Sequence, residues 1–301
     1  MKGEASGVSA SGDLEGRRKA GRRVRERVHG DDFVVRTAKD QSRFLQMYYD
    51  ATEEFCWGTI WASEALALKE RAMLALALTA SKGQIPAVEQ HVRTCRRAGW
   101  SPAEIGEILL HVYCYAGCYA SLGAFVAADA IFRREGGEIP EEDAPHHPDI
   151  ALSQEAREWA ERLGAGPLEA QGMQVRRELF GEEDVRDWMA DTSDDKFMMM
   201  FFRTAHAYCF GTVWARPGLG RRQRSMLSLA ITAAQNQHGA VRRHVRGCAL
   251  AGLTRREIGE VLLQVFAYAG MHATQDAFRV ASDTFRELAE EGFAIADGEL
   301  E

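Results

Sequence analysis

The chain contains two copies of one sequence, and this duplication limits the folds open to it more than any other feature. The segment CWGTIWA at residues 56–62 returns as CFGTVWA at residues 209–215, a shift of 153 positions. The same shift aligns residues 44–132 with residues 197–285 without a gap. Because each copy of an internal repeat is one structural unit, we expect two modules of the same fold.

Composition places the boundaries of these modules. Residues 136–165 are rich in Gly, Pro and acidic side chains, which predicts a linker. The modules then span residues 14–135 and 166–290. Residues 1–13 are polar and rich in Gly and Ser, so we expect a disordered tail there, and residues 291–301 form a short polar tail.

Both copies have the sequence pattern of helices. Residues 70–80 are apolar almost all round, which predicts a central buried helix. An inward-facing stripe at helical spacing follows, made by Val88, His91, Val92 and Cys95. Gly99 supplies a left-handed helix end, and Ser101-Pro-Ala-Glu104 is a capping box. No window alternates with period two, so the predicted fold is all-α.

Charge and composition exclude several function classes. The net charge of −7 and the pI near 5.8 argue against a nucleic acid or an anionic membrane as partner. No apolar run reaches the roughly 18 residues of a transmembrane helix, and the N-terminus lacks the apolar core of a signal peptide. We therefore expect a cytoplasmic protein whose six cysteines are reduced thiols. No Cys/His spacing is typical of a metal site, so none is predicted.

The second copy resembles the carboxymuconolactone decarboxylase family over nearly the whole of residues 210–270, and residues 57–117 are similar but match more loosely. The resemblance implies two alkylhydroperoxidase-like helical modules that form a pseudo-dimer and need no cofactor. Members of the family typically form hexameric rings of single modules. A fused pair implies the same six-module ring as a homotrimer.

A thiol peroxidase branch shares this helical core, and its CxxC motif is absent here. The two cysteine positions are Gln84 and Ala87 in the first copy and Gln237 and Ala240 in the second. Cys114 and Cys118 offer a different thiol pair, one helical turn apart, within the first copy only. Redox chemistry at these two cysteines remains an alternative function.

The reaction implied by the resemblance requires a cation and an acid. Decarboxylation leaves a carbanion, so the site needs a positive group for the developing oxyanion and a proton donor for carbon. The resemblance assigns the acid to His91 and His244, and the cation to Arg71 and Arg224. Each histidine recurs in the middle of an apolar helical stripe, which is also the pattern of a core residue.

Thr59 and Thr212 depart from the family, which usually has a glutamate at this place in a WGEIW motif. A hydroxyl can orient a ligand but cannot titrate near neutrality. The two copies also differ along one helix while their framework is kept, so we expect pockets that are no longer equivalent. The predicted substrate-binding residues are Thr59, Trp61, Thr212, Trp214, His111, Gln264, Tyr115 and Tyr268.

The sequence favours a cofactor-independent lyase or isomerase that acts on a small acidic or enolisable ring compound. With the glutamate replaced, a natural-product tailoring reaction fits as well as aromatic catabolism: decarboxylation, dehydration or cyclisation. The alternative from another class is a non-catalytic ligand-binding or assembly protein on the same scaffold. Binding without turnover would identify that alternative.

Overall fold

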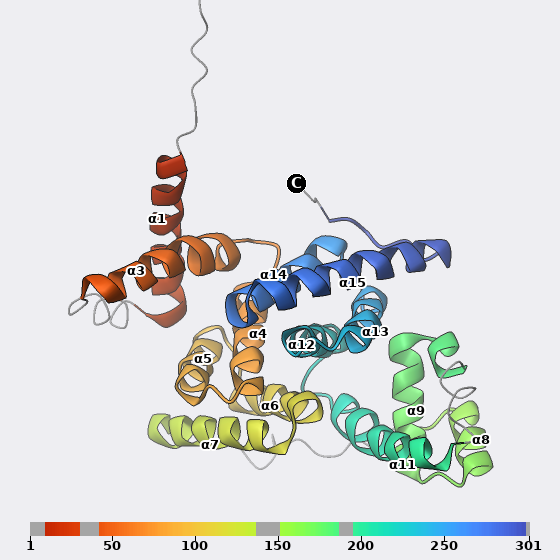
Figure 1. Cartoon of the computed structure of the whole chain (residues 1–301). Coiled ribbons are helices and arrows are strands. Elements are labelled where there is room, and N and C mark those ends of the chain that lie inside the picture. Colours follow the sequence, from red (N-terminus) through yellow and green to blue (C-terminus); the bar gives the residue numbers. More distant parts are fainter. Residues whose placement is uncertain (1–9, 31–41, 137–150, 187–194, 299–301) are drawn as a thin grey trace, which may run out of the picture.

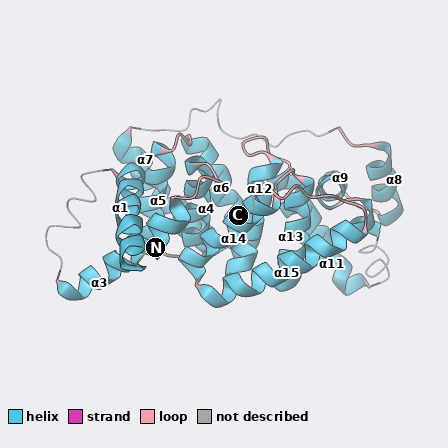
Figure 2. Ribbon diagram, turned by 90° about the horizontal axis from the view of Figure 1, so that it is seen from above, coloured by secondary structure: helices cyan, strands magenta, loops and turns pink. Residues whose placement is uncertain are grey.

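The computed structural model describes residues 10–30, 42–136, 151–186 and 195–298. Every regular element within these ranges is a helix, and none is a strand (Figure 2). The all-α prediction is confirmed.

The two modules contain the same helices in the same order. The first contains α1 (Ala10–His29), α3 (Arg43–Thr52), the π-helix η1 (Glu53–Trp61), α4 (Leu68–Ser81), α5 (Ile85–Arg97), α6 (Pro102–Ala116) and α7 (Cys118–Glu135). The second contains α8 (Gln154–Leu163), α9 (Pro167–Phe180), α11 (Lys196–Ala205), the π-helix η3 (His206–Trp214), α12 (Arg221–Ala234), α13 (His238–Leu250), α14 (Arg255–Ala269) and α15 (Met271–Glu290). Helix α8 and the helical residues 182–186 have no counterpart among the described residues of the first module.

Helices α4 and α12 meet at the centre of the molecule (Figure 1). Residues Arg71–Ala80 of α4 and Arg224–Ala233 of α12 are all buried, as predicted for the first of them. One apolar cluster includes side chains of both modules, among them Leu74 and Leu227. The modules therefore share a core and pack as a pseudo-dimer.

The predicted helix ends are also present. Gly99 has a φ of 87°, a left-handed conformation that glycine adopts without strain. The Ser101 hydroxyl accepts from the Glu104 N–H, and the Glu104 carboxylate accepts from the Ser101 N–H. Thr254 and Glu257 repeat this capping box at the start of α14.

The repeated CWGTIW and CFGTVW segments form π-helices, which the sequence pattern does not distinguish from α-helices. The Thr59 hydroxyl donates to the carbonyl oxygen of Glu54, five residues back, at 3.0 Å. In the second copy Thr212 donates to Ala207 in the same way at 2.8 Å. π-Helical turns are rare and are often found at functional sites.

Close helix contacts explain the glycines that recur before these segments. A Cβ atom at Gly21 of α1 would lie 2.0 Å from the carbonyl oxygen of Glu53. At Gly172 of α9 it would lie 1.9 Å from the carbonyl oxygen of His206. No real Cβ contact is so short, so α1 can pack on η1, and α9 on η3, only through glycine.

The predicted boundaries need three adjustments. Helix α1 begins at Ala10, inside the predicted disordered tail, whose residues 1–9 lie outside the described residues. Helix α8 lies inside the predicted linker, where Trp159 packs with Met173 of α9, and residues 137–150 of that linker are also not described. In the C-terminal tail, the carbonyl oxygens of residues 296 and 297 accept hydrogen bonds at the start of α14.

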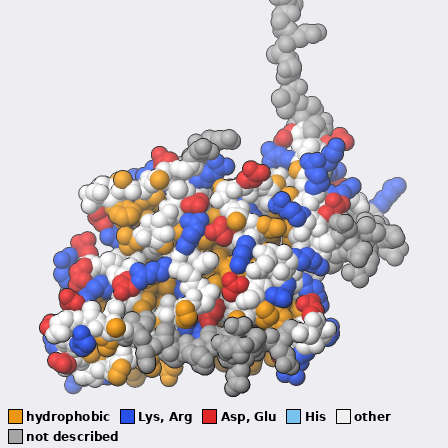
Figure 3. Space-filling model, turned by 180° about the vertical axis from the view of Figure 1, so that it is seen from behind, with side chains coloured by type: hydrophobic (Ala, Val, Ile, Leu, Met, Phe, Trp, Pro, Cys, Tyr) orange, Lys and Arg blue, Asp and Glu red, His pale blue; other side chains and the backbone are white. Residues whose placement is uncertain are grey.

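The surface of the described residues mixes charged and apolar side chains, as the face in Figure 3 shows. Two counterpart helices, α3 and α11, have no buried residue at all. Phe44 and Met47 of α3 are 81% and 71% exposed, and Phe197 of α11 is 76% exposed. None of the helices described is long and apolar enough to span a membrane.

Candidate active site

One cavity of about 640 Å³ lies between the two modules, and we call it the first-module cavity. The first module contributes most of its wall, from α1, α3, η1, α4 and α5, and α14 of the second module completes it. The lining residues are Arg25, His29, Tyr48, Tyr49, Ala51, Thr52, Phe55, Cys56, Trp57, Thr79, Gln84, Ala87, Gln90, His91, Ala267 and Tyr268.

The polar lining of this cavity suits an anion. Arg25 is a cation of its wall, and His29 and His91 supply two imidazoles, while the described residues that line it include no Asp or Glu. The Arg25 guanidinium is nearly buried, lies over the Tyr49 ring, and pairs at 3.3 Å with the buried carboxylate of Glu53. A guanidinium on the cavity wall could bind the carboxylate of a ligand.

His91, to which the resemblance assigns the acid, is among the residues that line the cavity. Its Nε2 lies 3.3 Å from the hydroxyl of Tyr268, which the second module supplies. The Trp61 ring lies nearly parallel to the imidazole, with centroids 6.4 Å apart. Burial lowers the pKa of His91 to about 4, so the free protein holds a neutral imidazole at pH 7. Its Nδ1 has no hydrogen-bond partner among the described residues.

Tyr268 can hold His91 in one tautomer. Burial raises the pKa of Tyr268 well above its usual range, so the phenol keeps its proton. That proton can be donated to the bare Nε2 of His91, which leaves the imidazole proton on Nδ1. Tyr268, which the sequence predicted to bind the substrate, lines the cavity and contacts His91 from the second module.

His244 has a similar setting built from the opposite modules. The Tyr115 ring from the first module lies 5.2 Å from the His244 ring, and Trp214 donates to the Tyr115 hydroxyl at 3.1 Å. Burial lowers the pKa of His244 to about 3. Phe180 also contacts the imidazole, with ring centroids 5.8 Å apart. Aromatic side chains thus surround this second histidine.

Arg71 and Arg224 lie in the core and do not line the first-module cavity. Arg71 pairs with Glu260 of the other module at 2.8 Å, and Arg224 pairs with Glu107 at 2.9 Å. Arg216 adds a second guanidinium to Glu107 at 2.6 Å. The guanidinium that does line the cavity is that of Arg25.

The two threonines of the altered motif also lie apart from the cavity lining. Thr59 is exposed, and besides its bond to Glu54 its hydroxyl accepts from Arg17 at 3.1 Å. Thr212 is half-buried and bonds to its own helix. In this structure the position of the family glutamate faces away from the first-module cavity.

His111 and Gln264 are fully buried at equivalent positions of α6 and α14. Nε2 of His111 lies 2.7 Å from the hydroxyl of Ser228, and Gln264 accepts from Arg71 at 3.1 Å. Both side chains therefore bind the central helix of the other module. Both were predicted from the sequence to bind the substrate. Neither is among the residues that line the first-module cavity.

The two cysteines of the redox alternative are free thiols on different helices, because α6 ends at Ala116 and α7 begins at Cys118. Cys114 forms its hydrogen bond with Cys209 of the second module, and this bond, together with burial, raises the pKa of Cys114. The same bond lowers the pKa of Cys209. A lowered pKa favours a reactive thiol, so within this pair the shift favours Cys209 and not Cys114.

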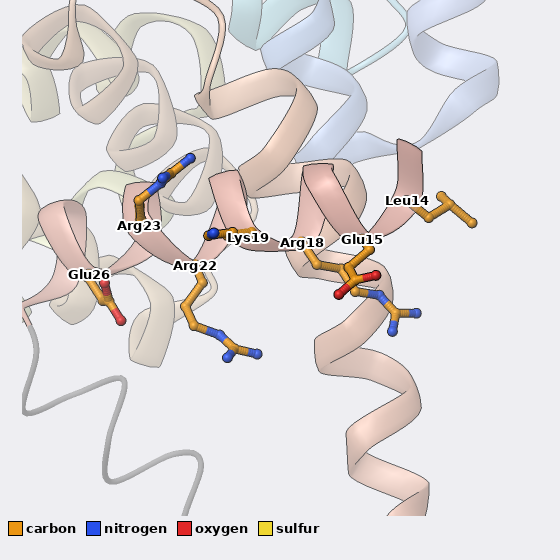
Figure 4. Close-up of a pocket in the computed structure, with 7 residues that line it drawn as sticks. All are labelled: Leu14, Glu15, Arg18, Lys19, Arg22, Arg23 and Glu26. Atoms are coloured by element: carbon orange, nitrogen blue, oxygen red, sulfur yellow. The ribbon is translucent and has the colours of Figure 1, made fainter. Parts of the chain in front are cut away.

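A second hollow lies along α1 (Figure 4). One helix supplies its whole lining: Leu14, Glu15, Arg18, Lys19, Arg22, Arg23 and Glu26. Arg22 pairs with Glu53 at 3.2 Å, and Arg18 pairs with Glu54. These pairs attach α1 to η1, and α1 in turn carries Arg25 and His29 to the cavity.

Comparison with known sequences decides the family. The profile of the carboxymuconolactone decarboxylase family matches residues 46–130 and again residues 200–283, together more than half of the chain. The chain belongs to this family. Each match covers one copy of the repeat, so the duplication predicted from the sequence is a duplication of the carboxymuconolactone decarboxylase module.

The curated relatives that match this chain are shorter than it is. A 4-carboxymuconolactone decarboxylase of Acinetobacter baylyi is 34% identical over 118 residues, which are 39% of this chain and 87% of the relative. The nitrosuccinic acid decarboxylase npaB of Metarhizium robertsii is 30% identical over 122 residues, 40% of this chain and 84% of the relative. An uncharacterised 15.0 kDa protein of Paracoccus denitrificans is 32% identical over 84 residues, 27% of this chain and 63% of that protein.

Two cavity residues were missed by the sequence analysis as site residues. Arg25 and His29 both lie in the segment GRRVRERVHG at residues 21–30, which is similar to GMQVRRELFG at residues 172–181. The signal that could have found the site is His29 itself, because the second segment has Phe180 in its place. Among the residues that the structure describes, no group of three or more His, Cys, Asp or Glu could hold a metal ion.

Proposed function

We propose that this protein is a lyase that removes CO₂ from a small carboxylic acid bound in the first-module cavity. The observation that carries the proposal is the wall of that cavity, to which Arg25, His29 and His91 all contribute. Two curated relatives are decarboxylases of small acids, which supports the same class of reaction here.

Arg25 would bind the acid and offset its charge. A guanidinium binds a carboxylate through two parallel hydrogen bonds, and it also attracts the enolate oxygen that forms as CO₂ leaves. Because the Arg25 side chain is itself nearly buried, this attraction is stronger than it would be in water. Glu53 then helps to hold the guanidinium in place, because Arg25 already bonds to it on the side of η1.

His91 would return a proton to carbon. An anion in the cavity favours the charged imidazole, so His91 takes up a proton when the acid binds. The carbon–carboxylate bond then breaks, its electron pair stays on the substrate carbon, and the imidazolium donates its proton there. Each turnover converts one carboxylate and one proton into the product and CO₂. Tyr268 keeps the ring oriented through the cycle.

The identity of the acid is a further part of the proposal. Tyr48 and Phe55 are 63% and 39% exposed and flank the cavity, so an aromatic or polyketide-like ring could pack against them. We propose a tailoring reaction on such a molecule. The replacement of glutamate by Thr59 removes no group from the cavity wall, so it leaves decarboxylation open.

The proposed reaction is tested by following CO₂ release from 4-carboxymuconolactone and from nitrosuccinic acid with metal-free enzyme under anaerobic conditions. Release that is proportional to enzyme and lost on heating is the expected result. Binding of both acids without turnover would instead identify a ligand-binding protein. If neither acid is turned over or bound, even at high enzyme concentration, the proposed reaction on acids of this class is wrong.

We also propose that three chains form a closed ring of six modules. Its support is the apolar surface of α3 and α11, which occupy equivalent positions and bury none of their own residues within the chain. Exposed apolar patches of this kind mark protein interfaces. Light scattering is expected to give a mass three times the 33.5 kDa of one chain. A monomer mass that persists at high concentration would contradict it.

A further inference from the structure

The two modules differ in the residue that lies against His91 in the first and against His244 in the second. His29 near the end of α1 lies 6.2 Å, centroid to centroid, from His91. Phe180 at the end of α9 lies 5.8 Å from His244. An imidazole in one module is therefore a phenyl ring in the other.

Polar neighbours fix the imidazole of His29. Its Nδ1 lies 2.8 Å from the amide nitrogen of Gln90 and 3.3 Å from the hydroxyl of Thr94, both on α5. An amide nitrogen only donates, so Nδ1 accepts and the proton of the neutral ring is on Nε2. Burial, with the nearby His91 and Arg25, lowers the pKa of His29 to about 3. At pH 7 the ring is thus a neutral hydrogen-bond donor.

The second module has replaced this whole polar setting. Gln90 and Thr94 correspond to Arg243 and Gly247 in the repeat. A Cβ atom at Gly247 would lie only 3.2 Å from the Phe180 ring, so the glycine makes room for the phenyl group. Residues 180 and 247 are thus in contact in the second module, as residues 29 and 94 are in the first. The two replacements convert a hydrogen-bonded imidazole into a packed aromatic contact.

The equivalent arginine of the second module has a different ion-pair partner. Arg176 occupies the place of Arg25 in the repeated segment, and its Nε and Nη2 donate to one oxygen of Asp184 at 3.0 and 2.9 Å. Asp184 lies nearby in sequence on the same module. Glu53, which pairs with Arg25, is replaced by the buried His206. The two equivalent arginines therefore pair with different carboxylates, Glu53 of η1 in the first module and Asp184 in the second.

We propose that His29 is a specificity-determining residue, whose Nε2–H binds an acidic group of the ligand together with Arg25, so that each chain binds one acid, in the first-module cavity. This rests on the proposed function in placing an acid in that cavity. The site around His244, with Phe180 in place of the imidazole, takes no acid and supports the fold.

The test is calorimetric titration of the full-length protein with succinate and with muconate, two dianions that do not lose CO₂. The expected stoichiometry is one anion per chain. His29→Asn removes the Nε2–H and is expected to weaken binding about ten-fold or more, as for a lost hydrogen bond to a charged group. His29→Gln can place an amide donor near the same point, and it is expected to stay within about three-fold of the unchanged protein.

Two controls separate specificity from folding. Phe180→Ala enlarges the second site without adding a donor and should leave both stoichiometry and affinity unchanged. His29→Phe combined with Thr94→Gly copies the second-module arrangement, and it should fold but lose anion binding. Thermal unfolding of each variant shows whether it is folded at the temperature of titration.

Three outcomes would overturn the inference: two anions bound per chain, unchanged affinity in folded His29→Asn, or no binding of either anion by the unchanged protein at millimolar concentrations. The inference and the proposed reaction fail separately. One anion bound through His29 without any CO₂ release from the test acids would uphold this inference and contradict the lyase proposal alone.

Discussion

Replacing His91 with alanine is expected to lower kcat/KM for decarboxylation by about 10²- to 10⁴-fold, the usual effect of losing a positioned proton donor. His91 is the imidazole that both lines the first-module cavity and meets Tyr268 at 3.3 Å. The loss should fall mainly on kcat, because Arg25 and His29 still bind the acid. The measurement is steady-state CO₂ release from whichever acid the unchanged enzyme converts.

His244→Ala is the matched control for this prediction. It removes the same buried imidazole from the same helix of the other module, where the partners are Tyr115 and Phe180. Its kcat/KM should stay within about three-fold of the unchanged enzyme once its stability has been checked. Equal losses in the two variants would show that both sites work, and equal retention would remove His91 from the mechanism.

The sequence was sufficient for the fold because the deciding signals are local. The apolar helix at residues 70–80 and the capping box at Ser101 can each be recognised within a few turns of chain. The duplication then indicates that both modules contain them. Helical spacing likewise showed that His91 faces inward. The π-helices escaped prediction because they differ from α-helices in hydrogen-bond register and not in the spacing of apolar residues that a sequence shows.

The site was only partly predictable because its residues meet through tertiary packing. His29 and Gln90 are 61 positions apart, and their contact exists only once α1 has packed on α5. Tyr268 reaches His91 from the other module, 177 positions away. The repeat shows that Tyr115 and Tyr268 are equivalent residues. It does not show that each of them contacts the histidine of the other module.

Arg71 shows what the sequence leaves out in another way. The resemblance implies a catalytic role for this arginine at the start of a buried helix, and the sequence alone gives no partner for it. The structure supplies one in Glu260, 189 positions away, with the carboxylate also bonded by Ser63. The same pairing recurs as Arg224 with Glu107. These crossed pairs lie where α4 and α12 pack against the other module's helices, so they hold the pseudo-dimer together.

Arg71→Ala is therefore expected to lower the free energy of unfolding by about 3–5 kcal/mol, because it leaves the buried carboxylate of Glu260 without its cation. Arg224→Ala should cost less, since Arg216 remains within 2.6 Å of Glu107. Arg71→Met combined with Glu260→Leu removes both charges and fills the space, so most of the lost stability should return. Urea unfolding of the three variants and the unchanged protein measures these differences.

Activity then distinguishes a structural arginine from a catalytic one. In the double variant Arg71→Met/Glu260→Leu the core is apolar but the cavity wall is unchanged, so kcat/KM per folded molecule should remain within a few-fold of the unchanged enzyme. Arg25→Met, which leaves the crossed pairs intact, should instead lose anion binding. A stable double variant that binds acids normally but has lost kcat would reverse this assignment, and Arg71 would then be the cation of the reaction as the family resemblance implied.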